Sequence, residues 1–186
     1  MRGLDQRAPR ALNGSVWVYQ IGGKDDLPQD VVSIVPPEAV FARGLAPEAI
    51  VGKLMRPAGE GEVITPDNFA RNRLFVEFLH EVIARHGPEL AALRAEAVRI
   101  GNGWVYIIDA RTPDPRGKVP REDILGAFPV KAGAVVAESY WRNPKHVILS
   151  KDGFFRLDAA LQKRLLGELA THHAEPPGGD VRAPAR

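Results

Sequence analysis

The stretch PDNFARNRLFVEFLHEVIARH, residues 66–86, carries the clearest helical pattern in the chain. Thr65, directly before it, is a suitable N-cap, because its hydroxyl can accept a hydrogen bond from a free backbone N–H of the first turn. Gly87, directly after it, favours the left-handed conformation that ends many helices. One stripe of this segment is apolar and consists of Phe75, Phe78, Leu79, Val82 and Ile83. The sequence therefore predicts a long amphipathic helix, followed by a second helix over 88–100.

Segments rich in Val and aromatic residues, which are typical of strands, lie on both sides of these helices. They predict strands over residues 15–21, 30–35, 104–109, 127–130, 134–140 and 146–149. Short helical segments at 37–40 and 47–50 each begin with Pro-Glu-Ala, and Pro suits the first helical position. A last helix over 158–170 is indicated by Asp158 as its cap and by Leu residues along one face.

The order of these elements is strands, helices, more strands and a final helix, without the regular strand–helix alternation of a parallel sheet. The sequence therefore predicts an α+β fold in which helices cover a mainly antiparallel sheet. We expect a single domain over 14–173, and a boundary near 57–64 is the less favoured alternative. Residues 1–13 and 174–186 lack apolar periodicity, so both segments are expected to be flexible tails.

The composition excludes several kinds of protein. The chain has no cysteine, so disulfides, thiolate catalysis and cysteine-ligated metal sites are all excluded. No stretch approaches the roughly 20 apolar residues that a membrane-spanning helix needs, and the first residues do not resemble a signal peptide. These features predict a cytoplasmic protein that does not enter a membrane.

The formal net charge of +2 suggests nucleic-acid binding, so the location of that charge matters. Residues 1–10 contain three Arg and one Asp, which accounts for the whole excess. Residues 171–186 contain two Arg, one Glu and one Asp, so the remaining body, 11–170, is neutral. Binding of nucleic-acid phosphates needs a basic surface, and in this chain it would have to depend on a local patch.

The motifs of common enzyme classes are incomplete in this chain. Leu54 follows Gly52-Lys53 at the position where a phosphate-binding loop requires Ser or Thr. His80 and His86 are too far apart in sequence to share a helix face, as the paired His ligands of zinc proteases do. The sequence therefore predicts no cofactor and no metal site, and it favours a non-enzymatic function without deciding that question.

The charged loop from Asp109 to Asp123 is the first candidate for a functional site. Asp109 and Arg111 lie at the exit of a predicted strand, and Arg116 follows in the same proline-rich segment. Loops held by a rigid scaffold often carry functional groups. The alternative is a solvated connector in which Asp109 and Arg111 form a simple ion pair.

The segment YWRNPKH, residues 140–146, is the second candidate. Tyr140, Trp141 and Arg142 belong to the residue types that dominate binding hot spots, because they cover a large area at low entropic cost. The alternative is structural, with the two rings filling the edge or the core of the sheet and Arg142 stacked on one of them.

The preferred hypothesis is a non-enzymatic module that binds a partner protein through the second-half sheet and its loops. The expected contact residues are Tyr140, Trp141, Arg142 and Arg116. A nucleic-acid-binding protein is a further alternative, in which the basic loop 111–121 acts together with Trp141.

A small hydrolase or transferase is the remaining alternative. His146 would act as the general base and Asp109 would orient it, because His titrates near neutral pH. Arg111 and Arg142 would hold an anionic group. The sequence specifies no substrate, partner identity, oligomeric state or pathway for any of these functions.

Overall fold

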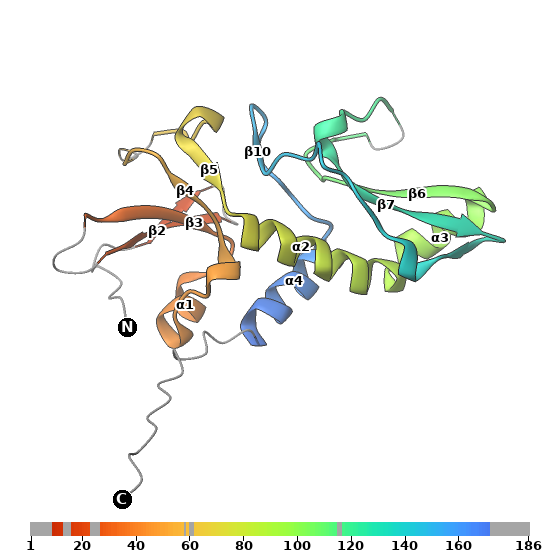
Figure 1. Cartoon of the computed structure of the whole chain (residues 1–186), viewed down its shortest axis with the longest axis horizontal. Helices are drawn as coiled ribbons and strands as arrows, with labels where there is room; N and C mark the ends of the chain where they lie inside the picture. The colour runs from red at the N-terminus through yellow and green to blue at the C-terminus, as the bar shows by residue number, and fades with distance from the viewer. Residues whose placement is uncertain are drawn as a thin grey trace, which may run out of the picture.

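The computed structural model of the chain describes residues 9–12, 16–22, 27–57, 59, 62–114 and 117–171. The fold is α+β, as the sequence predicts, with antiparallel sheets and four α-helices in these residues. Figure 1 shows an elongated body with one sheet at each end and helix α2 running between them. The strands therefore form two main sheets. Of the expected tails, 1–13 and 174–186, residues 1–8, 13 and 174–186 lie outside the described residues.

The first sheet is antiparallel and contains β1 (Arg10–Leu12), β2 (Val16–Ile21), β3 (Gln29–Ser33), β4 (Ile50–Leu54) and β5 (Phe69–Arg71). β2 and β3 confirm the strands expected at 15–21 and 30–35. Helix α1 (Pro37–Arg43) and the 3-10 turn η1 (Pro47–Ala49) confirm the two short helical segments. Strand β1 corrects the expected N-terminal tail, because its residues pair with β2. β4 and β5 are not predicted by the sequence pattern.

The long helix begins later than the sequence predicts. The observed elements are the 3-10 turn η2 (Pro66–Asn68), strand β5 and helix α2 (Arg73–His86). Asn72 is the N-cap in place of Thr65, and its Oδ1 accepts a hydrogen bond from the Leu74 N–H at 3.1 Å. The Asn72 Nδ2 group also donates to the carbonyls of Pro47 and Ile50. Pairing with β4 therefore outweighs helix propensity in the segment before Asn72.

The end of α2 also differs from the expectation. Gly87 has a φ of −52°, a right-handed conformation, and leads through η3 (Gly87–Glu89) into α3 (Ala91–Ile100). A Cβ atom at Gly87 would lie 2.7 Å from the Phe128 ring, so close packing is the reason for glycine here. The left-handed position is Gly101, after α3, with a φ of 73°.

The second sheet contains β6 (Gly103–Ile108), β7 (Ile124–Lys131), β8 (Ala134–Val135) and β9 (Trp141–Arg142). β7 lies in the middle and pairs antiparallel with the other three strands. β6 and β7 confirm the strands expected at 104–109 and 127–130, whereas the strand expected over 134–140 ends at Val135 and the 3-10 turn η5 (Ala137–Ser139) follows.

The C-terminal part of the fold is a short hairpin and a helix. β10 (Leu149–Ser150) pairs with β11 (Gly153–Phe154), so the strand expected at 146–149 is displaced toward the turn. Helix α4 (Ala159–Thr171) confirms the last predicted helix. Asp158 caps it as expected, because its Oδ1 accepts hydrogen bonds from the N–H groups of Ala160 and Leu161.

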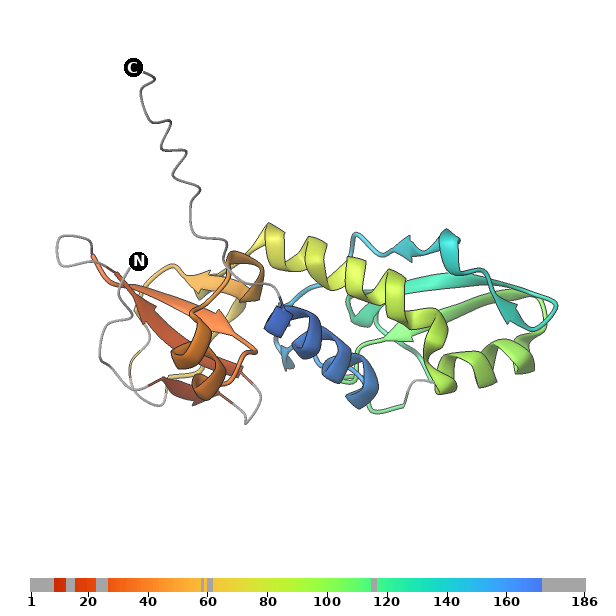
Figure 2. The same cartoon turned by 90° about the horizontal axis from the view of Figure 1, so that it is seen from below.

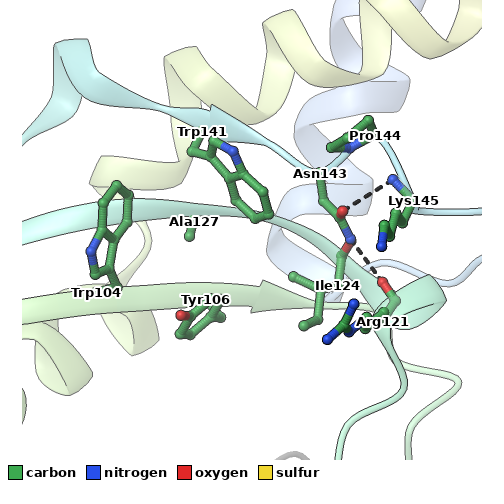
Figure 3. Close-up of a pocket in the computed structure, with 9 residues that line it drawn as sticks. All are labelled: Trp104, Tyr106, Arg121, Ile124, Ala127, Trp141, Asn143, Pro144 and Lys145. Carbon is green, nitrogen blue, oxygen red and sulfur yellow. Dashed lines mark hydrogen bonds between the residues drawn. The ribbon is translucent and has the colours of Figure 1, made fainter.

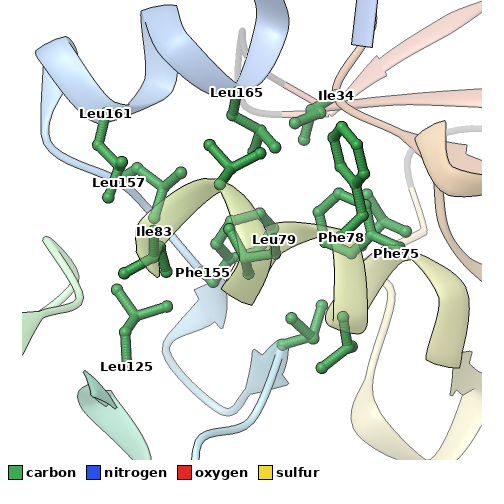
Figure 4. Close-up of a cluster of buried hydrophobic side chains, with 14 of the residues drawn as sticks. Ile34, Phe75, Phe78, Leu79, Ile83, Leu125, Phe155, Leu157, Leu161 and Leu165 are labelled. Carbon is green, nitrogen blue, oxygen red and sulfur yellow. The ribbon is translucent and has the colours of Figure 1, made fainter. Parts of the chain in front are cut away.

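One apolar core extends from the first sheet to the second. The predicted stripe of α2 is buried, and α4 packs beside this helix (Figure 2). Figure 4 shows Ile34, which follows β3, and Leu125 of β7 on different sides of the α2 side chains. Leu161 and Leu165 of α4 cover the same cluster. Helix α2 therefore joins the two sheets through packing.

Helices α2 and α3 pack against one face of the second sheet. Val105, Ile107 and Phe128 are buried on that face. Side chains alternate along a strand, so Trp104 and Tyr106 lie on the opposite face, which we call the open face. In the part of the chain that the structure describes, no helix has the length and apolar character needed to cross a membrane.

Candidate functional site

Asp109 and His146, which are distant in sequence, meet near the end of β6. His146 Nε2 lies 3.1 Å from Asp109 Oδ2, and the Arg111 guanidinium lies 2.9 Å from the same oxygen. Arg111 also lies 3.1 Å from Asp123 Oδ1. The structure thus brings together three residues of the hydrolase hypothesis. Solvent barely reaches them, since Asp109 is 0% and His146 4% exposed.

Hydrogen bonds engage the polar groups of this buried cluster. Arg111 donates to Ser150 Oγ and to the carbonyls of Gly153 and Val147. Its Nε atom is the exception and has no partner among the described residues. Asp123 accepts a further hydrogen bond from Thr112 Oγ1 at 2.9 Å. Arg111 therefore ties the exit of β6 to the β10–β11 hairpin.

The ionised carboxylate of Asp109 is held by several donors. Burial opposes its ionisation, but the His146 hydrogen bond, the Arg111 amide and guanidinium, and the Arg156 amide outweigh burial. The pKa of Asp109 is consequently lowered from its ordinary value. A carboxylate that is saturated with donors and closed to solvent has no free position for a substrate.

Arg142 does not join this cluster. Trp141 and Arg142 are neighbours on β9, so their side chains point to opposite faces of the sheet. The charge of Arg142 acts on His80 of α2, on the helix-covered side. Burial, Arg142 and His146 together lower the pKa of His80 to about 3. Trp141 and Arg142 therefore lie on opposite faces of the sheet, and no hydrogen bond or ion pair among the described residues joins Arg142 to the Asp109–His146 pair.

Tyr140 is turned into the fold. Its hydroxyl lies 2.8 Å from His80 Nδ1 and 3.4 Å from the Leu125 carbonyl oxygen. Its ring lies 5.0 Å from the Phe128 ring, centroid to centroid. Burial raises the pKa of Tyr140, against the opposing effect of Arg142, so the hydroxyl stays protonated. Arg116, the other expected contact residue, lies outside the described residues.

Trp141 lies on the open face, where it borders an aromatic groove. Ala127 of β7 pairs with Tyr106 of β6 on one side and with Trp141 of β9 on the other. Trp104, two residues before Tyr106, extends the same face (Figure 3). The exposed fractions of Trp104, Tyr106 and Trp141 are 48%, 49% and 43%. Ala127 itself is buried, and a cavity of about 490 Å³ extends from these rings toward Arg121, Ile124 and the segment 143–145.

Two cations lie at one end of the aromatic groove. Arg121 and Lys145 line it there, and both are exposed. Their side chains form no ion pair within the described part of the chain. Buried Asn143 fixes their backbones: its Nδ2 donates to the Arg121 carbonyl at 2.7 Å, and its Oδ1 accepts from the Lys145 N–H at 3.0 Å. The groove therefore combines an apolar body with a positively charged end.

Sequence reasoning identified Trp141, included Arg121 and Lys145 only as members of the candidate segments 109–123 and 140–146, and missed Trp104 and Tyr106. A signal for the last two was present, because WVYI at 104–107 alternates large aromatic and branched residues with the period of a strand. An aromatic pair two residues apart on a half-buried strand shares one face. No comparable signal marks the two cations, since they approach the groove only through the folded backbone around Asn143.

A metal centre finds no support in this geometry. Among the residues that the structure describes, no group of three or more His, Asp or Glu side chains is arranged to hold a metal ion.

No protein-family model matches the chain. No curated protein and no solved structure matches it either.

Proposed function

We propose that this chain is a protein-interaction module that binds a partner protein through the aromatic groove. The observation that carries the proposal is the row Tyr106–Ala127–Trp141, with Trp104 beside it. Trp and Tyr are the residue types most enriched at binding hot spots, and a pocket between rigid rings is the usual setting. A non-enzymatic role in the cytoplasm is part of this proposal and rests on the sequence alone.

The chemistry of the groove indicates what the partner presents. Apolar side chains of a partner would fill the cavity beside the three rings and remove the rings from water. Arg121 and Lys145, which form no ion pair within the described residues, favour a carboxylate at that end of the groove. The best-fitting partner is therefore a segment with apolar side chains and at least one acidic residue.

A hydrolase or transferase is less well supported. The Asp109–His146 pair has the geometry of a base and its orienting acid, but both side chains are buried and their hydrogen bonds are engaged. Arg142, which the hypothesis assigns with Arg111 to hold an anion, forms no hydrogen bond or ion pair with this cluster among the described residues. We assign this cluster a role in stability.

Nucleic-acid binding would use the same aromatic rings, because bases stack on exposed Trp and Tyr. A single strand also needs a continuous row of cations along its phosphates. The groove provides Arg121 and Lys145 at one end only. We therefore favour a protein partner and treat nucleic acid as an outcome that the experiment can reveal.

The test is selection of a phage-displayed library of random twelve-residue peptides on the full chain. We expect enrichment of peptides with apolar and acidic residues, and at least about tenfold weaker binding by Trp141→Ala and Trp104→Ala. Phe41→Ala is the matched control, because Phe41 is an exposed aromatic residue on α1, away from the groove. Each variant is first shown to unfold at the wild-type urea concentration.

Two results would contradict the proposal. One is a library that yields no peptide bound better by the wild type than by Trp141→Ala. The other is quenching of Trp fluorescence by a fluorescence-silent oligothymidine at low salt, lost in the groove variants, which would indicate a nucleic-acid-binding surface.

A further inference from the structure

Strand β6 forms an edge of the second sheet, and the register shows which of its backbone groups face outward. On β7, the carbonyls of Leu125 and Pro129 accept hydrogen bonds from residues on the side away from β6. Backbone groups of antiparallel strands alternate in direction, so Gly126 and Phe128 bond toward β6. The residues opposite Gly126 and Phe128 are Ile107 and Val105.

It follows that Trp104 and Tyr106 direct their N–H and C=O groups away from β7. In the described part of the chain, no hydrogen bond reaches these groups from a further strand or from a side chain. Natural proteins usually protect such an edge with Pro, with a charged residue or with a covering segment. The sequence of β6, GWVYII, contains neither Pro nor a charge.

Both faces of the sheet beside this edge are hollowed. The aromatic groove lies on the open face, with Trp104 and Tyr106 in its wall. On the helix side, an apolar pocket of about 260 Å³ borders the same strand. Its lining includes Leu90, Leu93, Ile107, Leu157 and Leu161, and Tyr106 lines both hollows.

An extended segment fits this arrangement because its side chains alternate between two faces. Placed along β6, every second side chain would pack against the outer sides of Trp104 and Tyr106, which form the β6 wall of the aromatic groove. The others would point toward the apolar pocket. Its backbone would meet the outward groups of Trp104 and Tyr106. Arg121 lies beyond the end of β6 in Figure 3, where an acidic residue at one end of the segment could reach it.

We propose that the partner binds as an added β-strand along β6, with apolar side chains at alternating positions and an acidic residue at the Arg121 end. This inference rests on the proposed protein-binding function and specifies its geometry. Main-chain hydrogen bonds would supply affinity, and the rings of Trp104 and Tyr106 together with the apolar pocket would supply specificity. A second copy of the chain is a less suitable occupant, since it would leave Arg121 and Lys145 without acidic partners.

The experiment uses a peptide enriched by the full chain and follows amide hydrogen exchange by NMR. In the free protein, the amides of Trp104 and Tyr106 should exchange quickly, whereas those of Val105 and Ile107 should already be protected. Bound peptide should slow exchange at Trp104 and Tyr106 at least about tenfold. The same peptide with alternate backbone nitrogens methylated should bind at least about tenfold more weakly, because it cannot donate to the edge.

A charge exchange tests the orientation of the added strand. Arg121→Glu should weaken an acidic peptide about tenfold, and replacing the terminal acid of the peptide by Lys should restore binding. Equal binding of both peptides by both proteins would overturn the assigned orientation. Lys131→Glu is the control, because Lys131 is exposed on β7 and does not line the groove.

The possible failures are distinguishable. A selected peptide could require Trp141 for binding and still leave the Trp104 and Tyr106 amides unprotected. That result would contradict strand addition but would support the groove as a binding site. A library without any enriched peptide overturns both proposals. The same two amides could instead become protected in the free protein as its concentration rises, with a dimer detected in sedimentation. That result would assign the edge to a second copy of the chain and contradict the proposal of a partner protein.

Discussion

Tyr106 and Trp141 face each other across Ala127, one from each strand that flanks β7. The row places a small buried side chain between two large rings, and these rings form part of the lining of the groove. Cross-strand neighbours on one face are usually in contact and stabilise the sheet. Here both rings remain about half exposed although Ala127 is buried, and exposed aromatic surface is a cost that a binding surface explains.

The first prediction concerns the floor of this groove. Ala127→Leu should fill the space between Tyr106 and Trp141 and weaken binding of a selected peptide at least about tenfold, because the partner side chain is displaced. Overpacking at this position should lower the free energy of unfolding by no more than about 3 kcal/mol. Isothermal titration and urea unfolding measure the two effects. Ala134→Leu, at an exposed position of β8, should leave peptide binding unchanged.

The second prediction concerns the packing of β9 against β7. A Cβ atom at Gly126 would lie 2.6 Å from the Trp141 carbonyl oxygen and would overlap the Tyr140 hydroxyl. Gly126→Ala should therefore displace β9 and cost about 1–3 kcal/mol in urea unfolding. Gly167→Ala is the control, because a Cβ there meets nothing within 4 Å and alanine favours the helix. Wild-type stability of Gly126→Ala would show that β9 is loosely held.

The sequence predicted the elements whose signals are local. Residues within a few positions of one another determine these elements, which are the apolar stripe of α2, the cap at Asp158 and the apolar strands β2, β3 and β6. Strand β5 was not predicted, because Thr65 and Pro66, which precede it, occupy positions that favour the start of a helix. Its strand conformation depends on pairing with β4, which lies earlier in the chain.

The candidate sites were predictable only in part. Asp109, Arg111 and His146 do meet, but their burial depends on the β10–β11 hairpin that folds over them. Adjacent aromatic and basic residues at 141 and 142 suggested one cluster, yet strand geometry sends them to opposite faces. Applying the same alternation to Trp104 and Tyr106 identifies the groove from the sequence.

The third prediction concerns the buried ion cluster. Asp109→Asn should cost about 3–5 kcal/mol at pH 7, because Arg111 loses a buried partner. The folded-state pKa of Asp109 is lowered, so its contribution is complete above the unfolded value near 3.9 and is lost as pH falls through the folded value. Asp152→Asn, in an exposed pair with Lys151, should change stability by about 0.5 kcal/mol or less.

Urea unfolding at pH 7 compares these two carboxylates directly. A difference of less than about 1 kcal/mol between Asp109→Asn and Asp152→Asn would show that the buried cluster contributes little to stability. The assignment of the cluster to stability would then fail, and the catalytic interpretation of Asp109 and His146 would regain support.

The fourth prediction follows from His80. Its folded-state pKa is about 3, whereas an unfolded histidine titrates near 6.5. Between these values the unfolded chain binds the extra proton, so stability should fall as pH decreases, by up to about 1.4 kcal/mol per pH unit. His80→Gln keeps a polar partner for Tyr140 without titrating, and its unfolding free energy should depend less on pH. Tyr140→Phe retains the histidine and should keep the wild-type slope. Parallel slopes for the wild type and His80→Gln from pH 6.5 to 4 would mean that His80 is already protonated, or solvated, in the folded protein.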